Sequence, residues 1–226
     1  MVAIAGAILY MSFGRAPARN LEAQVPSATR RAAPPLPSAP LSLSGAPVLG
    51  RRDAKVGMVV YSDFECPFCG KFARETLPAL KEQYVNSGQM LIAFRNFPLP
   101  NHRLAHKAAE AAACAAKQEK FWTYHDDLFV MPLALEEERL LERSLRLGLD
   151  AVAFRTCLAG EATSLVRSER ANAQPLGVTG TPTFFVGAME SGTNLRVVER
   201  ISGAQPLEKF KMILDRLLIG VEPAPL

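Results

Sequence analysis

Hydrophobic and polar positions divide the chain into three kinds of sequence. An almost wholly apolar N-terminal segment is followed by a stretch rich in proline, alanine and serine, and then by a long region of alternating strand-like and helix-like patterns. Within that region, the β-branched and aromatic runs at residues 58–61 and 90–97 predict two buried strands. Two further runs, at residues 181–187 and 195–201, are connected through Ser191, Gly192 and Thr193 and predict a hairpin.

Helices are predicted between the strands, because apolar residues there recur with a helical period. After the first strand, apolar residues recur every three to five positions and predict a helix face that packs on the sheet, formed by Phe68, Phe72, Leu77, Leu80 and Tyr84. Pro78 should kink this helix, because proline lacks the N–H that an interior helical residue donates. The remaining helices are predicted at residues 103–117, 119–130, 136–147, 150–158, 161–175 and 206–219. This order predicts an α/β fold with a helical insertion at about residues 101–175.

The N-terminal segments are predicted to lie outside the folded domain. Residues 1–13 fit the core of a signal peptide or the end of a membrane anchor, although they are too short to span a bilayer. Residues 14–47 hold seven of the 17 prolines and predict a stiff linker, of which residues 41–49 could add an edge strand. The folded domain is expected at residues 48–219, followed by a tail at 220–226.

Composition and charge narrow the class of protein. A chain of 226 residues with 49% hydrophobic content can bury a sizeable core in one domain. The net charge of +4 is concentrated at the N-terminus, because the first 55 residues carry seven basic and two acidic side chains. The remainder has a net charge of −1, so no general basic face is predicted and nucleic-acid binding is not expected.

A Cys-x-x-Cys pair directly follows the first predicted strand. Pro67 suits the first helical position, because the N–H that it lacks would have no partner there, so Cys66 falls at the N-cap and Cys69 one turn inside. The unpaired N–H groups and the positive end of the helix dipole favour an anion at that place and lower the pKa of Cys66. Cys66 is therefore the expected nucleophile, and Cys69 the thiol that resolves a mixed disulfide formed at Cys66.

Two other interpretations of the pair stay open at this point. A Cys-x-x-Cys can be half of a zinc site, but such sites need a second pair, whereas Cys114 and Cys157 stand alone and the three histidines show no ligand pattern. The pair could also form a purely structural local disulfide. Neither a metal nor an organic cofactor is expected.

Several stretches together resemble the DsbA-like thiol:disulfide oxidoreductases of the thioredoxin superfamily. The resemblance runs from about residue 45 to 219 and keeps the order and spacing of that family. The stretches that carry it are residues 62–69 (Ser-Asp-Phe-Glu-Cys-Pro-Phe-Cys), 94–99 (Phe-Arg-Asn-Phe-Pro-Leu), 111–116 (Ala-Ala-Ala-Cys-Ala-Ala), 120–122 (Lys-Phe-Trp) and 177–186 (Gly-Val-Thr-Gly-Thr-Pro-Thr-Phe-Phe-Val).

The resemblance implies a thioredoxin fold interrupted by a helical domain. It also implies that Pro182 is the cis-proline beside the dithiol, with Thr181, Glu65, Pro67 and Phe68 as the other neighbours of the two cysteines.

The chain departs from the thioredoxin pattern at one position near the dithiol. Many thioredoxin-fold enzymes carry a buried acid six residues before the first cysteine, where this chain has Val60. Proton transfer from Cys69 is therefore expected to use Glu65 or water.

The family implies exchange of the Cys66–Cys69 disulfide with cysteines of unfolded or reduced exported proteins, most simply as a disulfide donor. It further implies reoxidation by a quinone-linked thiol oxidase of the membrane, and a periplasmic or cell-envelope location with a tether through the N-terminus. Alternatives are a reductase or isomerase of the envelope, a thioredoxin-fold binding module or chaperone, and a kappa-class glutathione transferase. That transferase class is not expected to need a second attacking cysteine.

Cys114 and Cys157 both fall in the predicted insertion. A second disulfide between them is the preferred interpretation, since a similar extra bridge occurs in some relatives; two buried thiols are the alternative.

Overall fold

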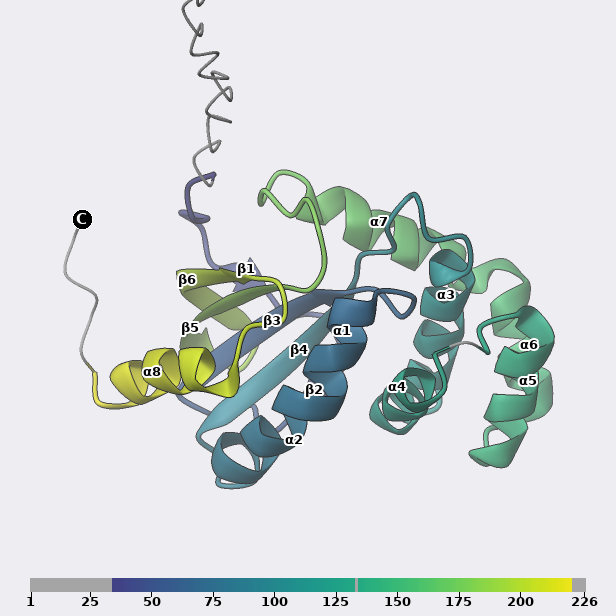
Figure 1. Ribbon diagram of the computed structural model, residues 1–226, viewed down its shortest axis with the longest axis horizontal. Coiled ribbons are helices and arrows are strands. Elements are labelled where there is room, and N and C mark those ends of the chain that lie inside the picture. Colours follow the sequence, from purple (N-terminus) through teal and green to yellow (C-terminus); the bar gives the residue numbers. More distant parts are fainter. Residues whose placement is uncertain (1–33, 133, 221–226) are drawn as a thin grey trace, which may run out of the picture. The chain divides into compact units, whose positions relative to one another are not determined.

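The computed structural model describes residues 34–132 and 134–220. Their core is a six-stranded sheet with the order β1-β6-β5-β3-β4-β2, in which β3 and β4 are parallel and the other neighbouring strands antiparallel (Figure 1). The strands are β1 (Leu41–Ser42), β2 (Val48–Leu49), β3 (Val56–Ser62), β4 (Met90–Asn96), β5 (Thr183–Ser191) and β6 (Asn194–Ser202). The parallel pair brings the C-terminal ends of β3 and β4 to one edge of the sheet, where the two cysteines follow β3.

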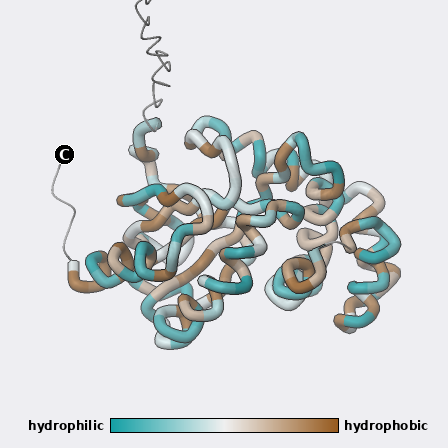
Figure 2. The backbone as a smooth tube through the Cα atoms, in the orientation of Figure 1, coloured by the Kyte–Doolittle hydropathy of each residue, from teal (hydrophilic) through white to brown (hydrophobic). Residues whose placement is uncertain are grey.

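The central strands are buried on both faces. Along β3, Met58 and Val60 belong to one apolar cluster and Val59 and Tyr61 to a second, as the two-residue period of a strand requires. The first cluster lies under the helix that follows β3 and under α8 (Leu207–Leu218), and the second lies under the end of α7 (Thr163–Ala173). Figure 2 shows the hydrophobic residues along the central strands and hydrophilic segments on the outer helices.

The helix after β3 is continuous but irregular, and we call it the redox helix. It consists of α1 (Pro67–Lys71), the π-helical turn η1 (Phe72–Thr76), α2 (Leu77–Leu80) and a second π turn, η2 (Lys81–Val85). Pro78 cannot donate to a carbonyl one turn earlier, and its ring would crowd that carbonyl. The wider turn η1 directly precedes it, with the N–H of Leu77 bonded to the carbonyl of Phe72. The irregularity expected at Pro78 therefore takes the form of a π turn.

A helical region is inserted between β4 and β5, as predicted. It comprises α3 (Ala105–Ala116), α4 (Phe121–Val130), α5 (Glu137–Arg146), α6 (Ala151–Thr156), the π turn η3 (Cys157–Glu161) and α7. Nine of the twelve residues of α3 are buried, so this helix forms the centre of the insertion. Its alanine side chains are small enough for α4, α5, α6 and α7 to pack closely around it.

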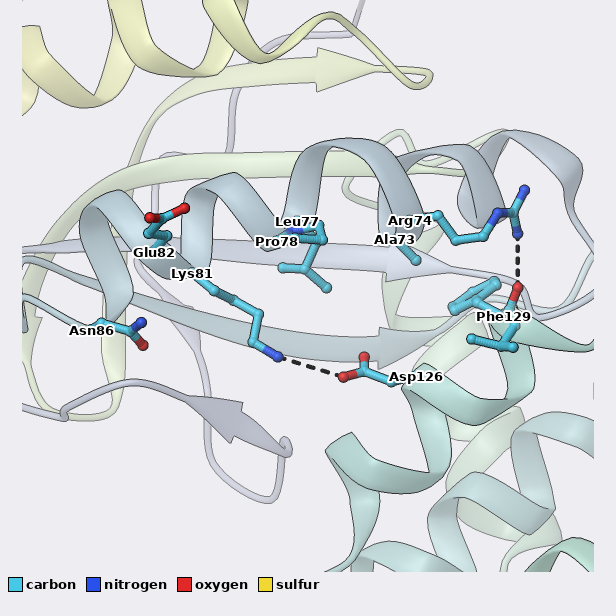
Figure 3. Close-up of a pocket in the computed structure, with 10 residues that line it drawn as sticks. Ala73, Arg74, Leu77, Pro78, Lys81, Glu82, Asn86, Asp126 and Phe129 are labelled. Atoms are coloured by element: carbon cyan, nitrogen blue, oxygen red, sulfur yellow. Dashed lines mark hydrogen bonds and ion pairs between the residues drawn. The ribbon is translucent and has the colours of Figure 1, made fainter.

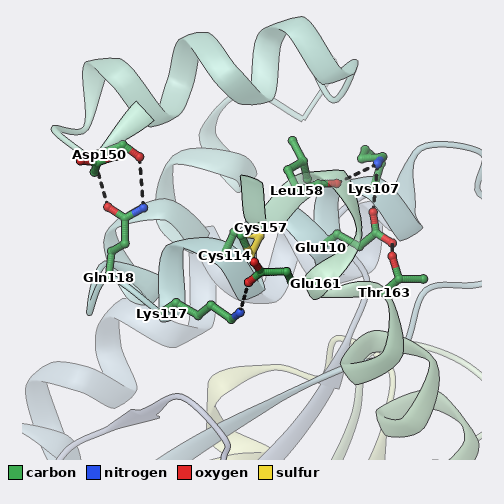
Figure 4. The surroundings of a disulfide bond; sticks show 10 residues. All are labelled: Lys107, Glu110, Cys114, Lys117, Gln118, Asp150, Cys157, Leu158, Glu161 and Thr163. Carbon is green, nitrogen blue, oxygen red and sulfur yellow. Dashed lines mark hydrogen bonds and ion pairs between the residues drawn. A yellow bond between two sulfur atoms is a disulfide. The ribbon is translucent and has the colours of Figure 1, made fainter. Parts of the chain in front are cut away.

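A disulfide ties α3 to the far end of the insertion (Figure 4). Cys114 and Cys157 are bonded at an S–S distance of 2.02 Å, with their Cα atoms 5.7 Å apart. Near the bridge, Gln118 and Asp150 exchange two hydrogen bonds and Lys117 pairs with Glu161. The bridge therefore lies in a set of polar contacts that all join α3 to the α6–η3 segment.

The folded domain begins earlier than residue 48. Leu41 and Ser42 pair with β6, and Leu43 is completely buried, although all three fall in the predicted linker. The edge strand expected within residues 41–49 is present as β1 and β2, whereas the burial of Leu43 was not expected, because the partners of β1 lie about 150 residues away on β6. The apolar segment 1–13, linker residues 14–33 and tail residues 221–226 lie outside the described residues.

Candidate active site

The two cysteines lie at the N-terminus of the redox helix. Cys66 is the N-cap residue, with an extended backbone, and Pro67 opens the helix, so that Cys69 comes in the first turn. Both side chains are buried, and both are free thiols in this structure. The backbone N–H of Gly70 bonds to the carbonyl of Cys66 and closes the first turn. This local geometry follows from Pro67, whose fixed φ and missing N–H suit the first helical position.

The two thiols are shifted in opposite directions. A hydrogen bond from the Cys69 thiol, with further ones from the backbone N–H groups of Cys69 and Phe68, outweighs burial and lowers the pKa of Cys66 to about 5. Burial raises the pKa of Cys69 well above its ordinary value, and the neighbouring Cys66 raises it further. At neutral pH the pair therefore holds one thiolate, on Cys66, and one thiol, on Cys69.

The loop before β5 faces the first cysteine. The Thr181–Pro182 peptide bond is cis, and the carbonyl oxygen of Thr181 lies 3.4 Å from Cys66 Sγ. The Thr181 hydroxyl is buried and has no hydrogen-bond partner among the described residues. Because β5 pairs directly with β3, with Tyr61 opposite Thr183, the sheet register brings this loop to the cysteines.

Phe68 does not belong to the buried face predicted for the helix. Its side chain is 61% exposed, whereas Phe72, Leu77 and Tyr84 are buried as expected. Cys69 takes the inward position of the first turn, and Phe68 lies one residue and about 100° earlier around the helix, so it projects to solvent. The site therefore presents an exposed aromatic ring between its two cysteines.

The Glu65 carboxylate, expected to take part in proton transfer from Cys69, is hydrogen-bonded to the start of α3. Its Oε2 accepts hydrogen bonds from the backbone N–H groups of Leu104, at 2.7 Å, and Ala105, at 2.9 Å. The carboxylate therefore caps the start of α3, where unpaired N–H groups favour a negative charge. Glu65 thus joins the insertion to the loop between β3 and the redox helix. Neither of these hydrogen bonds goes to Cys69.

Sequence reasoning missed Asp63, which organises the loop before Cys66. Its Oδ1 accepts the N–H of Glu65 at 2.7 Å, and its Oδ2 accepts the N–H of Leu99 and contacts His102 Nδ1, both at 2.8 Å. Its side chain is completely buried. Its position in the stretch that resembles the family was the one signal in the sequence, because its partners Leu99 and His102, in the loop after β4, come near it only in the folded chain.

The region beside the redox helix also holds an open groove. Its volume is about 500 Å³, and it lies between the redox helix and α4 (Figure 3). Arg74 donates to the Phe129 carbonyl at 2.8 Å across it, and Lys81 reaches Asp126 at 3.5 Å. None of the predicted site residues lines this groove.

The described residues contain no cluster of three or more histidine, cysteine or carboxylate side chains placed to hold a metal ion. Within residues 34–132 and 134–220, no helix combines the length and hydropathy needed to cross a bilayer.

Antiporter sequences match part of the chain. The Na(+)/H(+) antiporter NhaA 3 of Salinispora tropica is 40% identical over 141 residues, which are 62% of this chain and 21% of the antiporter. The chain thus spans about a fifth of the length of that relative. Transport is therefore not carried over to this chain.

Proteins named for disulfide formation match this chain over larger shares of their own length. The probable disulfide bond formation protein D of Bacillus anthracis is 32% identical over 147 residues, which are 61% of this chain and 68% of that protein. The crystal structure of alpha-DsbA1 from Wolbachia pipientis has a TM-score of 0.70 at 27% identity, covering 80% of this chain and 94% of that one. A family profile described as "Thioredoxin" matches residues 42–216. The predicted fold is thereby confirmed, and the chain belongs to the thioredoxin family, among the DsbA-like thiol:disulfide oxidoreductases.

Proposed function

We propose that this chain exchanges its Cys66–Cys69 disulfide with cysteines of exported proteins and acts as a disulfide donor. The observation that carries the proposal is the opposite shift of the two thiols: the pKa of Cys66 is lowered to about 5 and that of Cys69 is raised. A thiolate that the fold stabilises is a good leaving group and makes the reduced form favourable, which is the property of an oxidising dithiol.

The exchange takes two displacements. A client thiolate attacks Cys66 Sγ of the disulfide, and the S–S electron pair leaves with Cys69, which takes up a proton. A second client thiolate then attacks the client sulfur of the mixed disulfide, and Cys66 leaves as its stable thiolate. The client loses two electrons and gains a disulfide, while the dithiol becomes reduced. A quinone-linked thiol oxidase of the membrane is the proposed acceptor of those electrons.

The surroundings of Cys66 support a protein client. Phe68, which is 61% exposed, offers an apolar contact beside the nucleophile, and the loop at Thr181 and Pro182 offers backbone groups to an extended segment. A location in the periplasm or cell envelope, with a tether through the N-terminus, suits this chemistry, because disulfides persist in oxidising compartments. The two bonded cysteines of the insertion are consistent with such a compartment.

Single-cysteine variants test the roles of the two thiols. In Cys69→Ser the mixed disulfide at Cys66 has no internal thiol to release it, so client complexes should accumulate. Cys66→Ser should trap almost none. Equal trapping by the two variants would falsify the assignment.

The direction of exchange is tested by the reduction potential of the pair, measured against glutathione. A potential well above that of the glutathione pool supports a donor, and one well below it favours the reductase or isomerase alternative. A chaperone or binding module would keep its client affinity when both cysteines are replaced, whereas turnover requires the dithiol.

A further inference from the structure

A small cavity lined by Cys69 lies in the core beside the redox helix. It has a volume of about 10 Å³, which is about the space that the centre of one water molecule needs. Most of its wall is apolar core, but four polar side chains also line it: Cys69, Ser62, Trp122 and His125. The Ser62 hydroxyl hydrogen-bonds to Cys69, and the indole N–H of Trp122 is buried without a partner among the described residues. The buried thiol therefore faces a polar spot inside the core.

His125 is the titratable side chain that shares this cavity with Cys69. It is 3% exposed and packs against aromatic rings, with its ring centroid 4.9 Å from that of Phe129 and 5.4 Å from that of Phe94. Its Nδ1 lies 2.8 Å from Asp126 Oδ1. With a carboxylate as acceptor, Nδ1 carries the hydrogen and Nε2 keeps its lone pair. Burial lowers the pKa of His125, so the ring is neutral near pH 7, and a proton that reaches Nε2 must be matched by loss of the Nδ1 proton to Asp126.

Asp126 connects this pair to solvent. Its side chain is 48% exposed, and it lines the open groove between the redox helix and α4 (Figure 3). The inner cavity and the outer groove share Ala73, Leu77 and Phe129 as wall residues. Burial acts to raise the pKa of Asp126, but the hydrogen bond from His125 and the nearby Lys81 outweigh it, and the net shift is downward. One side of the His125–Asp126 pair thus lies at the cavity and the other at the groove.

The other polar groups near Cys69 are not placed to exchange its proton with solvent. Val60 stands where many thioredoxin-fold enzymes carry a buried acid, and the hydrogen bonds of Glu65 go to the start of α3. Cys66 Sγ is the atom that Cys69 bonds to in the reaction, so it cannot also take up the proton of Cys69. The charged groups that influence His125 are Asp126 on its own helix and Lys81 on the redox helix.

We propose that His125 exchanges the proton of Cys69 with solvent, acting through the cavity on one side and through Asp126 on the other; this inference rests on the proposed exchange function. When Cys69 resolves a mixed disulfide, its proton passes to His125 Nε2, by way of a water in the cavity, while the Nδ1 proton passes to Asp126 and then to the groove. The S–H electron pair stays on Cys69, which bonds to Cys66 Sγ, and the client sulfur leaves and takes a proton from solvent. When Cys69 is the leaving group, the proton runs in reverse.

Release of a chromophoric thiol from a preformed mixed disulfide at Cys66 tests the proposal, with thionitrobenzoate as the probe. His125→Asn keeps a polar group near Asp126 but cannot titrate, and Trp122→Phe is the matched control, because it removes a polar group of the cavity that does not titrate. Release should be about 10-fold to 100-fold slower in His125→Asn near pH 7, and the defect should shrink toward about pH 10, where hydroxide replaces the base. Trp122→Phe should stay within about threefold of wild type at every pH.

A defect in His125→Asn that is equal at all pH values, or no defect, would overturn the inference. His125→Gln, judged by the same pH profile, serves if His125→Asn does not fold. Attachment of the probe to Cys66 reports the first step and should be unchanged in all variants. If wild-type protein itself fails to release the probe, the proposed exchange function fails instead.

Discussion

Replacing Cys69 by alanine should move the titration of its partner thiol by a predictable amount. The hydrogen bond from Cys69 is the largest cause of the lowered pKa of Cys66, which falls from 9.0 to about 5. A hydrogen bond to a charged group contributes about 1.5–3 kcal/mol, and one pKa unit corresponds to about 1.4 kcal/mol, so its loss should raise the pKa by about 1–2 units. Cys69→Ala should therefore titrate at about 6–7, whereas Cys69→Ser, which keeps a donor, should stay close to wild type.

The rate of alkylation of Cys66 by iodoacetamide, followed against pH, measures this shift. Thiolate absorbance in the ultraviolet gives an independent titration of the same group. An unchanged midpoint in Cys69→Ala would mean that the helix N–H groups stabilise the thiolate without Cys69. Equal shifts in Cys69→Ala and Cys69→Ser would show that packing, and not the donor, is responsible.

The same pKa makes the stability of the reduced protein depend on pH. Because the Cys66 pKa is lower in the folded chain than in the unfolded one, the thiolate contributes stability that is complete above about pH 9 and is lost as the pH falls through about 5. At pH 7 the contribution is about two units, or about 3 kcal/mol. The oxidised protein lacks this contribution. In denaturant titrations the reduced form should therefore be the more stable at pH 7, and the difference should fade toward about pH 4; a gap that widens on acidification would refute the reasoning.

Two further predictions concern the framework. Replacing Cys114 and Cys157 together by alanine should lower the free energy of unfolding by about 4 kcal/mol, since the bridge closes a loop with a sequence separation of 43; Cys66 reactivity should be unchanged, and a large loss of that reactivity would contradict a purely stabilising role. Asp63→Ala should cost about 3 kcal/mol in urea unfolding, because the N–H groups of Glu65 and Leu99 lose their acceptor, and wild-type stability would show that the loop is held by other contacts.

The parts of the site that are local in sequence were predictable. Pro67 places Cys66 at the helix N-cap by its own covalent geometry, so the different environments of the two thiols follow from adjacent residues. The strands and helices of the core were likewise predictable, because apolar residues recur along each element with the period of its buried face. The oxidoreductase assignment rested on these local features together with the family resemblance.

The parts that depend on distant partners were not predictable. The burial of Leu43 follows from the pairing of the neighbouring strand β1 with β6, and the hydrogen bonds of Glu65 follow from the position of the N-terminus of α3; neither partner is near in sequence. Phe68 has the right spacing for a buried face, but helix periodicity does not say where the sheet beneath the helix ends. The cavity behind Cys69 is formed by β3, β4, the redox helix and α4, and no single stretch of sequence contains it.

The two edge strands of the sheet, β1 and β2, are only two residues long. β1 covers β6 at Leu195 and Asn194, and β2 covers β4 at Ala93 and Ile92. Strand edges with free N–H and C=O groups invite pairing with other extended chains, and very short edge strands together with charged side chains limit that hazard. Arg196, on β6, adds such a charge beside the margin. If the clients are unfolded chains, as proposed, these short margins limit the length of sheet edge on which such a chain could pair.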